Sequence, residues 1–585
     1  MKKIKKVLRK KWWIITLLFS AVVGIVLSVI GFSKISDTDS FYETARLFLL
    51  NVQFEKDWQP LHWTLIIGRW LILFAFIFFS ARIFIQIIAP RWWNNTKKYF
   101  PCSKRYLFVG AGKQAKILAQ NLSEKHCRCI FLLPKTKEND NALFVELNDM
   151  GAIVLYVNFE DEAMKFPQKI DKSFFMEEDE NLNMEMSVRL LKQFENAHIY
   201  IRTESKQFYS HIKQYKNAEI HIFNQSDLTA GLFVKKHPML DSPNIEIDHK
   251  KLLVKGEFNM LLLGFGWQGQ ELLKKCVCDS QFVGSTFRAT IIDKDFETNY
   301  GDYPILFDEC IKHYNLQFKT ETVGSKTFYE WIDAEIHNFN RIIIALGNDS
   351  INIDTAGKIT KILHKHGKLN TEKIVFTRVQ KLNSYSDDFT TFGKLTDIYT
   401  KEIIVNEVED EIAKMVNYVY CRYDVPLFEE FTETDKENIK IRWKWKNKEK
   451  GEKTTLFGKD SSRAVARNIE NIMKITSKNI SNLNDFELDI IAENEHLRWN
   501  AFHFVNGIRK WKLNEINTHN AKLTDKNENL LKHGCIVPFS ELDNVSKKVR
   551  QLGNVNENYI ETDRRIVCHF PLFLKEVELL KNKNE

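Results

Sequence analysis

Residues 259–269 read Asn-Met-Leu-Leu-Leu-Gly-Phe-Gly-Trp-Gln-Gly, and this stretch decides the fold. Its mostly apolar first half predicts a short buried strand, and the Gly-x-Gly-x-x-Gly spacing opens a helical stretch. Gly264 and Gly266 let the chain turn tightly and let a phosphate approach the helix N-terminus. The next predicted strand ends at Asp293, 24 residues after Gly269, where an acid can bind ribose hydroxyls. Together these features favour a dinucleotide-binding unit; the alternative is a glycine turn kept for helix–strand packing beside an empty cleft.

The pattern occurs a second time, nearer the N-terminus. Residues 105–109 predict a buried strand that leads into Gly110-Ala111-Gly112 and a helical stretch. The strand after that helix ends in Pro134-Lys135, where the sequence offers no acid for a ribose. The case for NAD is therefore weaker in this first unit, and packing of the glycine turn is the competing explanation.

Further strands support two tandem units. Predicted strands at 172–176 and 197–202 follow the first glycine turn, and strands at 341–347 and 373–379 follow the second. Strands that alternate with helices predict a parallel sheet in each unit.

These residues resemble the potassium-uptake regulator (TrkA-N) and RCK family of nucleotide-binding domains, over 104–228 and 257–405. The resemblance implies domains that bind NAD(H), ATP, ADP or ions, and that dimerise to transmit a shape change. It implies a first group of nucleotide contacts and a second, weaker group: Gly264, Gly266, Gly269 and Asp293; Gly110 and Gly112.

Two apolar runs precede the first unit. Residues 12–32 carry no charge over 21 residues, enough to cross a bilayer at about 1.5 Å per residue. The second run, 63–89, carries Arg69 and Arg82, which can snorkel or face a protein interior. Basic residues flank both runs on their outer sides and acids prevail in 33–62. The positive-inside rule therefore predicts a hairpin in the inner (cell) membrane with both termini cytoplasmic.

The segment between the runs bears on pore formation. It predicts one short amphipathic helix at about 41–52, and residues 41–60 contain no glycine. A potassium filter needs stacked backbone carbonyls from a TVGYG-like sequence, so a potassium-selective pore is not expected. A less selective pore and simple anchoring both stay open.

Charge and cysteine content narrow the function classes. The formal net charge is +8, and the first eleven residues carry seven Lys and Arg. The rest of the chain is therefore close to neutral, and a nucleic-acid partner is not expected. The nine cysteines fall on the predicted cytosolic side, so disulfides are not expected either.

The C-terminal part has a different character. A helix is predicted after Arg463, and a second helix holds Glu-His-Leu-Arg-Trp at 495–499, followed by a His-x-x-x-Val-Pro-x-x-x-Leu segment from His533. These elements resemble the bacterial ryanodine-receptor-repeat (RyR) domain over about 460–580, although Gly507-Ile508 departs from the family's Gly-Trp.

A ligand site is predicted on that second helix. Glu495, Arg498 and Trp499 share a helix face, so Trp499 could stack a purine while Arg498 grips a phosphate. The predicted contacts of the module are Arg463, Glu495, His496, Arg498 and Trp499. The competing explanation is a core tryptophan beside an ordinary ion pair.

The sequence thus predicts a membrane α-hairpin followed by α/β architecture: two Rossmann-like (RCK-N type) domains and a mostly α RyR-like domain. The predicted segments are a basic tail, a span, an external segment, a span, two Rossmann-like domains, a connector and the RyR-like domain: 1–11, 12–32, 33–62, 63–89, 104–228, 257–405, 406–459 and 460–585.

The leading hypothesis is a ligand-gated membrane protein, a channel or a membrane effector of the anti-phage type. It would sense NAD(H), ADP, ATP or a nucleotide second messenger and assemble as a homo-oligomer, with four chains as the guess. No catalytic constellation and no metal site is found in the sequence. The alternatives are a membrane-tethered NAD(P)-dependent oxidoreductase or redox sensor, and a regulatory subunit of an ion transporter.

Overall fold

The computed structural model divides the chain into two compact units, 1–101 and 102–585. It describes the following residues: 12–34, 40–48, 62–83, 94, 102–123, 127–205, 218–381, 386–422, 425–427, 429–443, 454–516, 526–527, 530–552 and 558–584. The predicted basic tail 1–11, most of the external segment and the end of the second span lie outside the described residues.

The first unit consists of three helices, α2 (Trp12–Phe32), α3 (Ser40–Phe48) and α4 (Trp63–Ile83). Helix α3 is the short amphipathic helix that the sequence predicts between the two apolar runs. Among the described residues one helical stretch, Trp63–Ala81, is long and apolar enough to cross a membrane, and Phe19–Phe32 is a shorter apolar stretch. The span predicted at 63–89 therefore has a helical counterpart, whereas two complete spans stay a prediction.

Helices α2 and α4 pack closely because small residues line their contact. A Cβ atom on Gly31 would lie 2.6 Å from Cβ of Leu65, and one on Gly68 would overlap the hydroxyl of Ser28. Such small residues allow two helix backbones to approach within a membrane. The opposite faces carry exposed apolar side chains, including Phe19, Val22, Trp70, Phe74, Ile77 and Phe79. This exposed apolar surface is what a hairpin surrounded by lipid requires.

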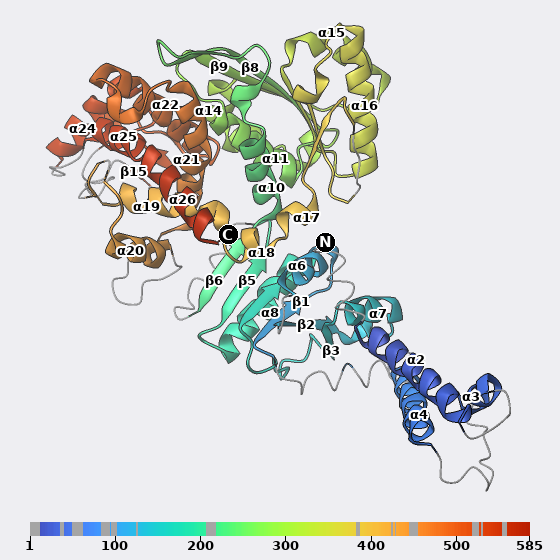
Figure 1. Ribbon diagram of the computed structural model, residues 1–585. Coiled ribbons are helices and arrows are strands. Elements are labelled where there is room, and N and C mark those ends of the chain that lie inside the picture. Colours follow the sequence, from blue (N-terminus) through green and yellow to red (C-terminus); the bar gives the residue numbers. More distant parts are fainter. Residues whose placement is uncertain are drawn as a thin grey trace. The chain divides into compact units, whose positions relative to one another are not determined.

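The second unit contains two parallel sheets, shown in blue to cyan and in green to yellow in Figure 1. The first sheet has the strand order β3-β2-β1-β4-β5-β6. Its elements are β1 (Lys104–Val109), α6 (Lys113–Leu122), β2 (Cys127–Pro134), α7 (Asn141–Asp149), β3 (Ile153–Val157), β4 (Lys172–Phe175), α8 (Glu180–Gln193), β5 (His198–Arg202) and β6 (Glu219–Phe223). This is the doubly wound Rossmann order, with its switch point between β1 and β4.

The second sheet repeats that order as β10-β9-β8-β11-β12-β13, and β7 (Glu246–Asp248) pairs antiparallel with β8. Its main elements are β8 (Leu253–Leu263), α11 (Trp267–Asp279), β9 (Ser285–Ile292), β10 (Leu316–Lys319), α15 (Lys326–Glu335), β11 (Arg341–Ile344), α16 (Asp349–Lys365), β12 (Val375–Arg378) and β13 (Thr390–Phe392). The predicted α/β class with parallel sheets is confirmed. The switch point between β8 and β11 lies beside the second glycine turn.

The chain returns to the first domain after completing the second sheet. Helices α17 (Leu395–Ile398) and α18 (Lys401–Ile404) contribute Leu395, Ile398 and Ile404 to the apolar core of the first domain. The side chain of Asn121 donates to the carbonyl oxygen of Tyr399 at 3.2 Å. Residues up to 405, predicted as the end of the second unit, therefore pack on the first.

The C-terminal module is mostly helical and shares one apolar core with the second Rossmann domain. Its helices are α19 (Glu411–Tyr420), α20 (Glu433–Trp443), α21 (Leu456–Ile475), α22 (Asp485–Phe504), α24 (Leu542–Gln551), α25 (Tyr559–Cys568) and α26 (Phe570–Asn584). Asn484 caps α22 and forms a reciprocal capping box with Glu487. A hydrogen bond from the backbone N–H of Val283 to the side chain of Asn494, 2.8 Å, joins α22 to the Rossmann domain.

Candidate functional site

The second glycine turn adopts the geometry that its sequence predicts. Gly264 follows β8 with φ +96°, and a Cβ atom there would lie 2.5 Å from the carbonyl oxygen of Ala345. A Cβ atom on Gly269 would overlap the carbonyl oxygen of Gly264. These two glycines are required by close backbone approach.

Gly266 serves a different purpose. It is the N-cap of α11, has φ −60°, and makes no side-chain cap hydrogen bond. A Cβ atom on Gly266 would meet only the Tyr300 hydroxyl, at 3.8 Å. The space in front of the N–H groups of this 13-residue helix is therefore kept open by the lack of a side chain.

Asp293 stands beside this turn at the end of β9. Its Oδ2 accepts the backbone N–H of Phe265 at 2.7 Å, and its Oδ1 accepts that of Asp295 at 2.8 Å. The first bond ties the carboxylate to the glycine turn. Each carboxylate oxygen can accept a further hydrogen bond, so Asp293 can still receive two hydroxyl groups from a ligand.

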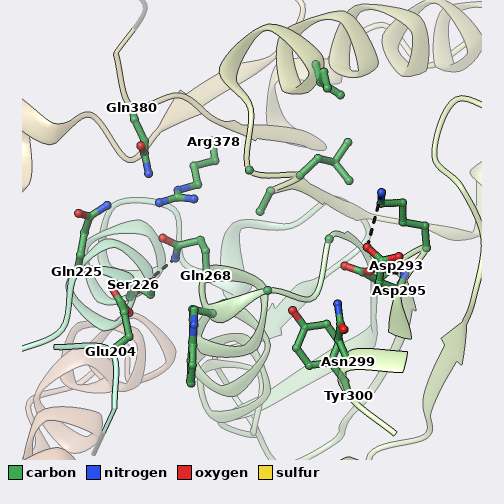
Figure 2. A pocket seen from close by; sticks show the side chains of 18 of the residues that line it. Glu204, Gln225, Ser226, Gln268, Asp293, Asp295, Asn299, Tyr300, Arg378 and Gln380 are labelled. Atoms are coloured by element: carbon green, nitrogen blue, oxygen red, sulfur yellow. Dashed lines mark hydrogen bonds and ion pairs between the residues drawn. The ribbon is translucent and has the colours of Figure 1, made fainter. Parts of the chain in front are cut away.

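A cavity of about 700 Å³ opens over the turn, and both Rossmann domains line it. We call it the shared cavity. The second domain contributes the turn, Asp293, Asn299, Tyr300, Arg378 and Gln380, and the first contributes Gln114, Arg202 and Glu204. Gln225 and Ser226 come from α10 (Gln225–Lys236), which follows the first sheet. Figure 2 shows Arg378, Gln268, Gln225 and Glu204 on one side of the cavity and Asp293, Asn299 and Tyr300 on the other.

The first of these sides holds polar atoms whose hydrogen-bonding capacity is unused. Four buried atoms have no hydrogen-bond partner among the described residues: Nε of Arg202, Oε2 of Glu204, Oε1 of Gln268 and Nε of Arg378. The residue Gln268 is only 4% exposed, and its Nε2 donates to the Ser226 carbonyl oxygen at 3.1 Å. A buried polar atom without a partner costs about 1–3 kcal/mol, so a polar occupant of this side would recover that cost.

The charges on this side are shifted by burial. Burial raises the pKa of Glu204, and burial lowers the pKa of Arg378 despite its proximity to Glu204. Arginine nevertheless keeps its charge at neutral pH. Two guanidinium groups therefore face one carboxyl group that is held less readily in its charged form, which favours an anionic group in the cavity.

The first glycine turn lacks a comparable arrangement. Gly110 has φ +98°, and a Cβ atom there would lie 2.8 Å from the backbone nitrogen of Glu177. Gly112 is the N-cap of α6 without a side-chain cap bond. Neither glycine lines the shared cavity, although Gln114 from the same helix does. The structure thus brings the predicted second-unit contacts together and leaves the first-unit pair outside them.

The predicted C-terminal contacts lie in the interior of the module. Glu495 and Arg498 are fully buried and form a two-point ion pair, with N–O distances of 2.8 and 2.7 Å. His496 contacts Oδ2 of Asp563 at 3.0 Å and the carbonyl oxygen of Val537 at 2.8 Å. These three side chains satisfy one another and the backbone, and none of them lines the shared cavity.

Trp499 and Arg463 are placed differently. The ring of Trp499 is partly buried and lies 3.7 Å from that of His503 and 4.8 Å from that of His533, centroid to centroid. Arg463 lines a small cavity of about 80 Å³ and pairs with Asp410 at 2.8 Å and Asp460 at 3.0 Å. The ligand-binding role of these five residues, like the RyR resemblance, stays a prediction.

The unpartnered residues of the shared cavity were missed by the sequence reasoning. Arg202 and Arg378 are the last residues of β5 and β12. Both strands are predicted from the sequence, and ligands of doubly wound sheets bind beyond the carboxyl ends of the strands, so a usable signal existed for the two arginines. Glu204 and Gln268 carry no such signal, because only the approach of the two domains gives them their environment.

Redox chemistry at the cysteine pair of α11 is disfavoured by burial. Burial raises the pKa of the Cys276 thiol to about 12 and that of Cys278 to about 11. The thiolate is the reactive form, so these thiols are held in their inert form. The described residues contain no group of three or more His, Cys, Asp and Glu side chains suited to a metal ion.

No protein-family profile and no curated protein matches the sequence. Similar solved structures include the GsuK channel, at 12% identity and TM-score 0.38 over 68% of this chain and 97% of that chain. The GsuK RCK domain matches at 11% and 0.37, over 55% and 83%, and a dipicolinate synthase component from Bacillus halodurans matches at 9% and 0.20, over 53% and 98%. At these identities and TM-scores, the function proposed below rests on the residues of this chain.

Proposed function

We propose that the chain is a ligand-sensing membrane protein whose cytosolic unit binds a nucleotide-type ligand in the shared cavity. The observation that carries this proposal is the combination at one site of an uncapped helix N-terminus at Gly266, the carboxylate of Asp293 and buried polar atoms without partners among the described residues. The volume of about 700 Å³ falls within the range of about 300–1,000 Å³ that is usual for small-molecule sites.

The two sides of the cavity suggest how such a ligand lies. A phosphate at the N-terminus of α11 would receive backbone N–H groups. The ribose attached to it would place its hydroxyls against Asp293. A second charged or amide-bearing part of the ligand would then reach Arg202, Arg378 and Gln268. This arrangement fits NAD(H), or another nucleotide with a long phosphate-bearing extension, better than a bare nucleoside.

The proposed output is a change in the membrane hairpin. A ligand that contacts both Rossmann domains stabilises the arrangement in which both line the cavity, and so shifts a conformational equilibrium. Coupling energies of about 1–3 kcal/mol per site are typical. Two helices cannot enclose an aqueous pore, so a channel would need several copies, and a tetramer is proposed. A membrane effector of the anti-phage type would use the same coupling.

Binding is tested on the full-length protein in detergent by thermal shift with NAD⁺, NADH, ADP, ATP and a cyclic dinucleotide, followed by calorimetry on the best of them. The proposal predicts saturable binding to the wild type and loss of binding in Asp293→Asn and Arg378→Met. Lys547→Met, an exposed change on α24, is the matched control and should bind normally. The absence of binding by every nucleotide would refute the proposal.

Output is tested by ion flux from liposomes that contain the protein, with and without the bound nucleotide. The proposal predicts flux that depends on the nucleotide and disappears in Arg378→Met. Flux that ignores the nucleotide, or no flux and no nucleotide-dependent toxicity in cells, would contradict the proposed coupling even if binding were intact.

A further inference from the structure

A second cavity, of about 280 Å³, lies on the other part of the first sheet, between strands β4–β6 and the C-terminal module. We call it the lysine cavity. Lys172, Tyr200, Glu219 and His221 come from the sheet, and Glu407 comes from the segment that follows α18. Lys414, Lys440, Trp443 and Lys459 come from α19, α20 and α21.

The carboxylates of the lysine cavity are already engaged. The imidazole of His221 contacts Glu407 at 2.7 Å and Glu219 at 3.2 Å. Lys414 pairs with Glu411 at 2.7 Å and lies 3.9 Å from Glu407. The His221 ring is held in position from its other side by Tyr200, which stacks on it at 4.5 Å.

Three ammonium groups are left without a carboxylate. Lys172 donates to the Tyr200 hydroxyl at 2.9 Å, and Lys459 lies over the Trp443 ring at 4.9 Å. Neither of them, nor Lys440, forms an ion pair with a carboxylate of the described residues. Lys459 also lies in the first turn of α21, where a positive charge opposes the helix dipole. The cavity therefore carries uncompensated positive charge at a helix N-terminus.

A buried donor provides an independent indication of a ligand. Trp443 is 4% exposed, and its indole N–H has no hydrogen-bond partner in the part of the chain that the structure describes. Burial also lowers the pKa of Lys459 to about 8 and lowers that of Lys172. Both shifts are the mark of ammonium groups that lack a nearby anion.

We propose that the lysine cavity is a binding site for a small phosphomonoester dianion, separate from the nucleotide site. Three ammonium groups and an indole N–H supply donors for the phosphate oxygens. The volume of about 280 Å³ lies below the usual range for drug-sized ligands, about 300–1,000 Å³, which suits a phosphate on a single sugar rather than a dinucleotide. Because the walls come from the first Rossmann domain and the C-terminal module, the anion holds those two parts together.

The test uses the full-length protein in detergent, with inorganic phosphate and ribose 5-phosphate as probes in calorimetry. The site predicts saturable binding of one anion per chain, about tenfold or more weaker in Lys459→Met and weakened in Trp443→Phe, which removes the N–H and keeps a ring. Lys440→Met, at an exposed rim position, tests the charge without risk to folding. Lys547→Met is the matched surface control and Asp293→Asn the control for the nucleotide site, and both should bind phosphate normally.

The outcomes separate the two proposals. Phosphate binding that survives Asp293→Asn but falls in Lys440→Met and Lys459→Met supports the lysine cavity, whatever the nucleotides do. No saturable phosphate binding, a response reproduced by sodium chloride at equal ionic strength, or equal binding by Lys440→Met and wild type would each overturn it.

Discussion

Replacing Gly266 by alanine separates a glycine that serves a ligand from glycines that serve packing. At φ −60° alanine is allowed, and its Cβ would meet only the Tyr300 hydroxyl at 3.8 Å. The lost conformational freedom of glycine stabilises by about 0.4–1 kcal/mol, and the poorer N-cap opposes this, so the net change in stability stays within about 1 kcal/mol.

The same methyl group lies where a phosphate would approach the N-terminus of α11. Each hydrogen bond to a charged group contributes about 1.5–3 kcal/mol. Loss of one such bond weakens binding by roughly 10–150-fold, since each 1.4 kcal/mol is a factor of ten. Calorimetry on full-length Gly266→Ala with the nucleotide that binds wild type should show this loss at an unchanged melting temperature.

Three other glycines provide the comparison. Gly264→Ala puts a side chain at φ +96°, which costs about 1–3 kcal/mol, and Gly269→Ala overlaps a carbonyl oxygen, so both should lower the melting temperature. Gly112→Ala, the equivalent of Gly266 in the first domain, should change neither stability nor binding, because its Cβ would lie 3.3 Å from the flexible Gln114 side chain. Wild-type affinity in Gly266→Ala would refute the assignment of the phosphate position.

Three further predictions concern stability. Burial raises the pKa of Asp279 from 3.8 to about 7, so the folded state binds the extra proton and stability falls as pH rises from about 4 to 7, by an order of magnitude of 4 kcal/mol; Asp279→Asn should flatten this part of a denaturation–pH profile and be the more stable protein at pH 8, and an unchanged profile would disprove it. Glu495→Gln leaves the buried Arg498 charge without its partner and should cost about 3–5 kcal/mol in urea unfolding, whereas the double change to methionine should recover most of that; equal losses in both would count against a buried pair. Gly68→Leu should separate α2 from α4 and lower the melting temperature in detergent, while Ile77→Leu on the exposed face should not; equal behaviour of the two would argue against this packing.

The sequence predicts local elements well because their signals are local. The strand before Gly264 and the strand that ends before Asp293 are both present, and the spacing of the turn correctly predicts that Asp293 lies beside it. The limits of β8 are longer than predicted, since it begins at Leu253. That extension pairs with β7, a partner that the apolar run alone does not indicate.

Features that depend on long-range packing were beyond the sequence. The return of Leu395 and Ile398 to the first domain follows from burial against residues almost 300 positions earlier in the chain, such as Asn121. The helix spacing of Glu495 and Arg498 is the same for an exposed pair, a ligand site and a buried pair. Burial alone distinguishes these cases, and it is decided by the elements that cover α22.

The most direct test of a receptor that couples a nucleotide to the bilayer is hydrogen exchange on the full-length protein in nanodiscs, with and without the nucleotide that binds. Amide protection should rise at 264–268 and 202–204, the two sides of the shared cavity, and exchange should also change within 63–81. Protection confined to other regions would contradict the site, and an unaltered apolar helix at saturating nucleotide would contradict the coupling.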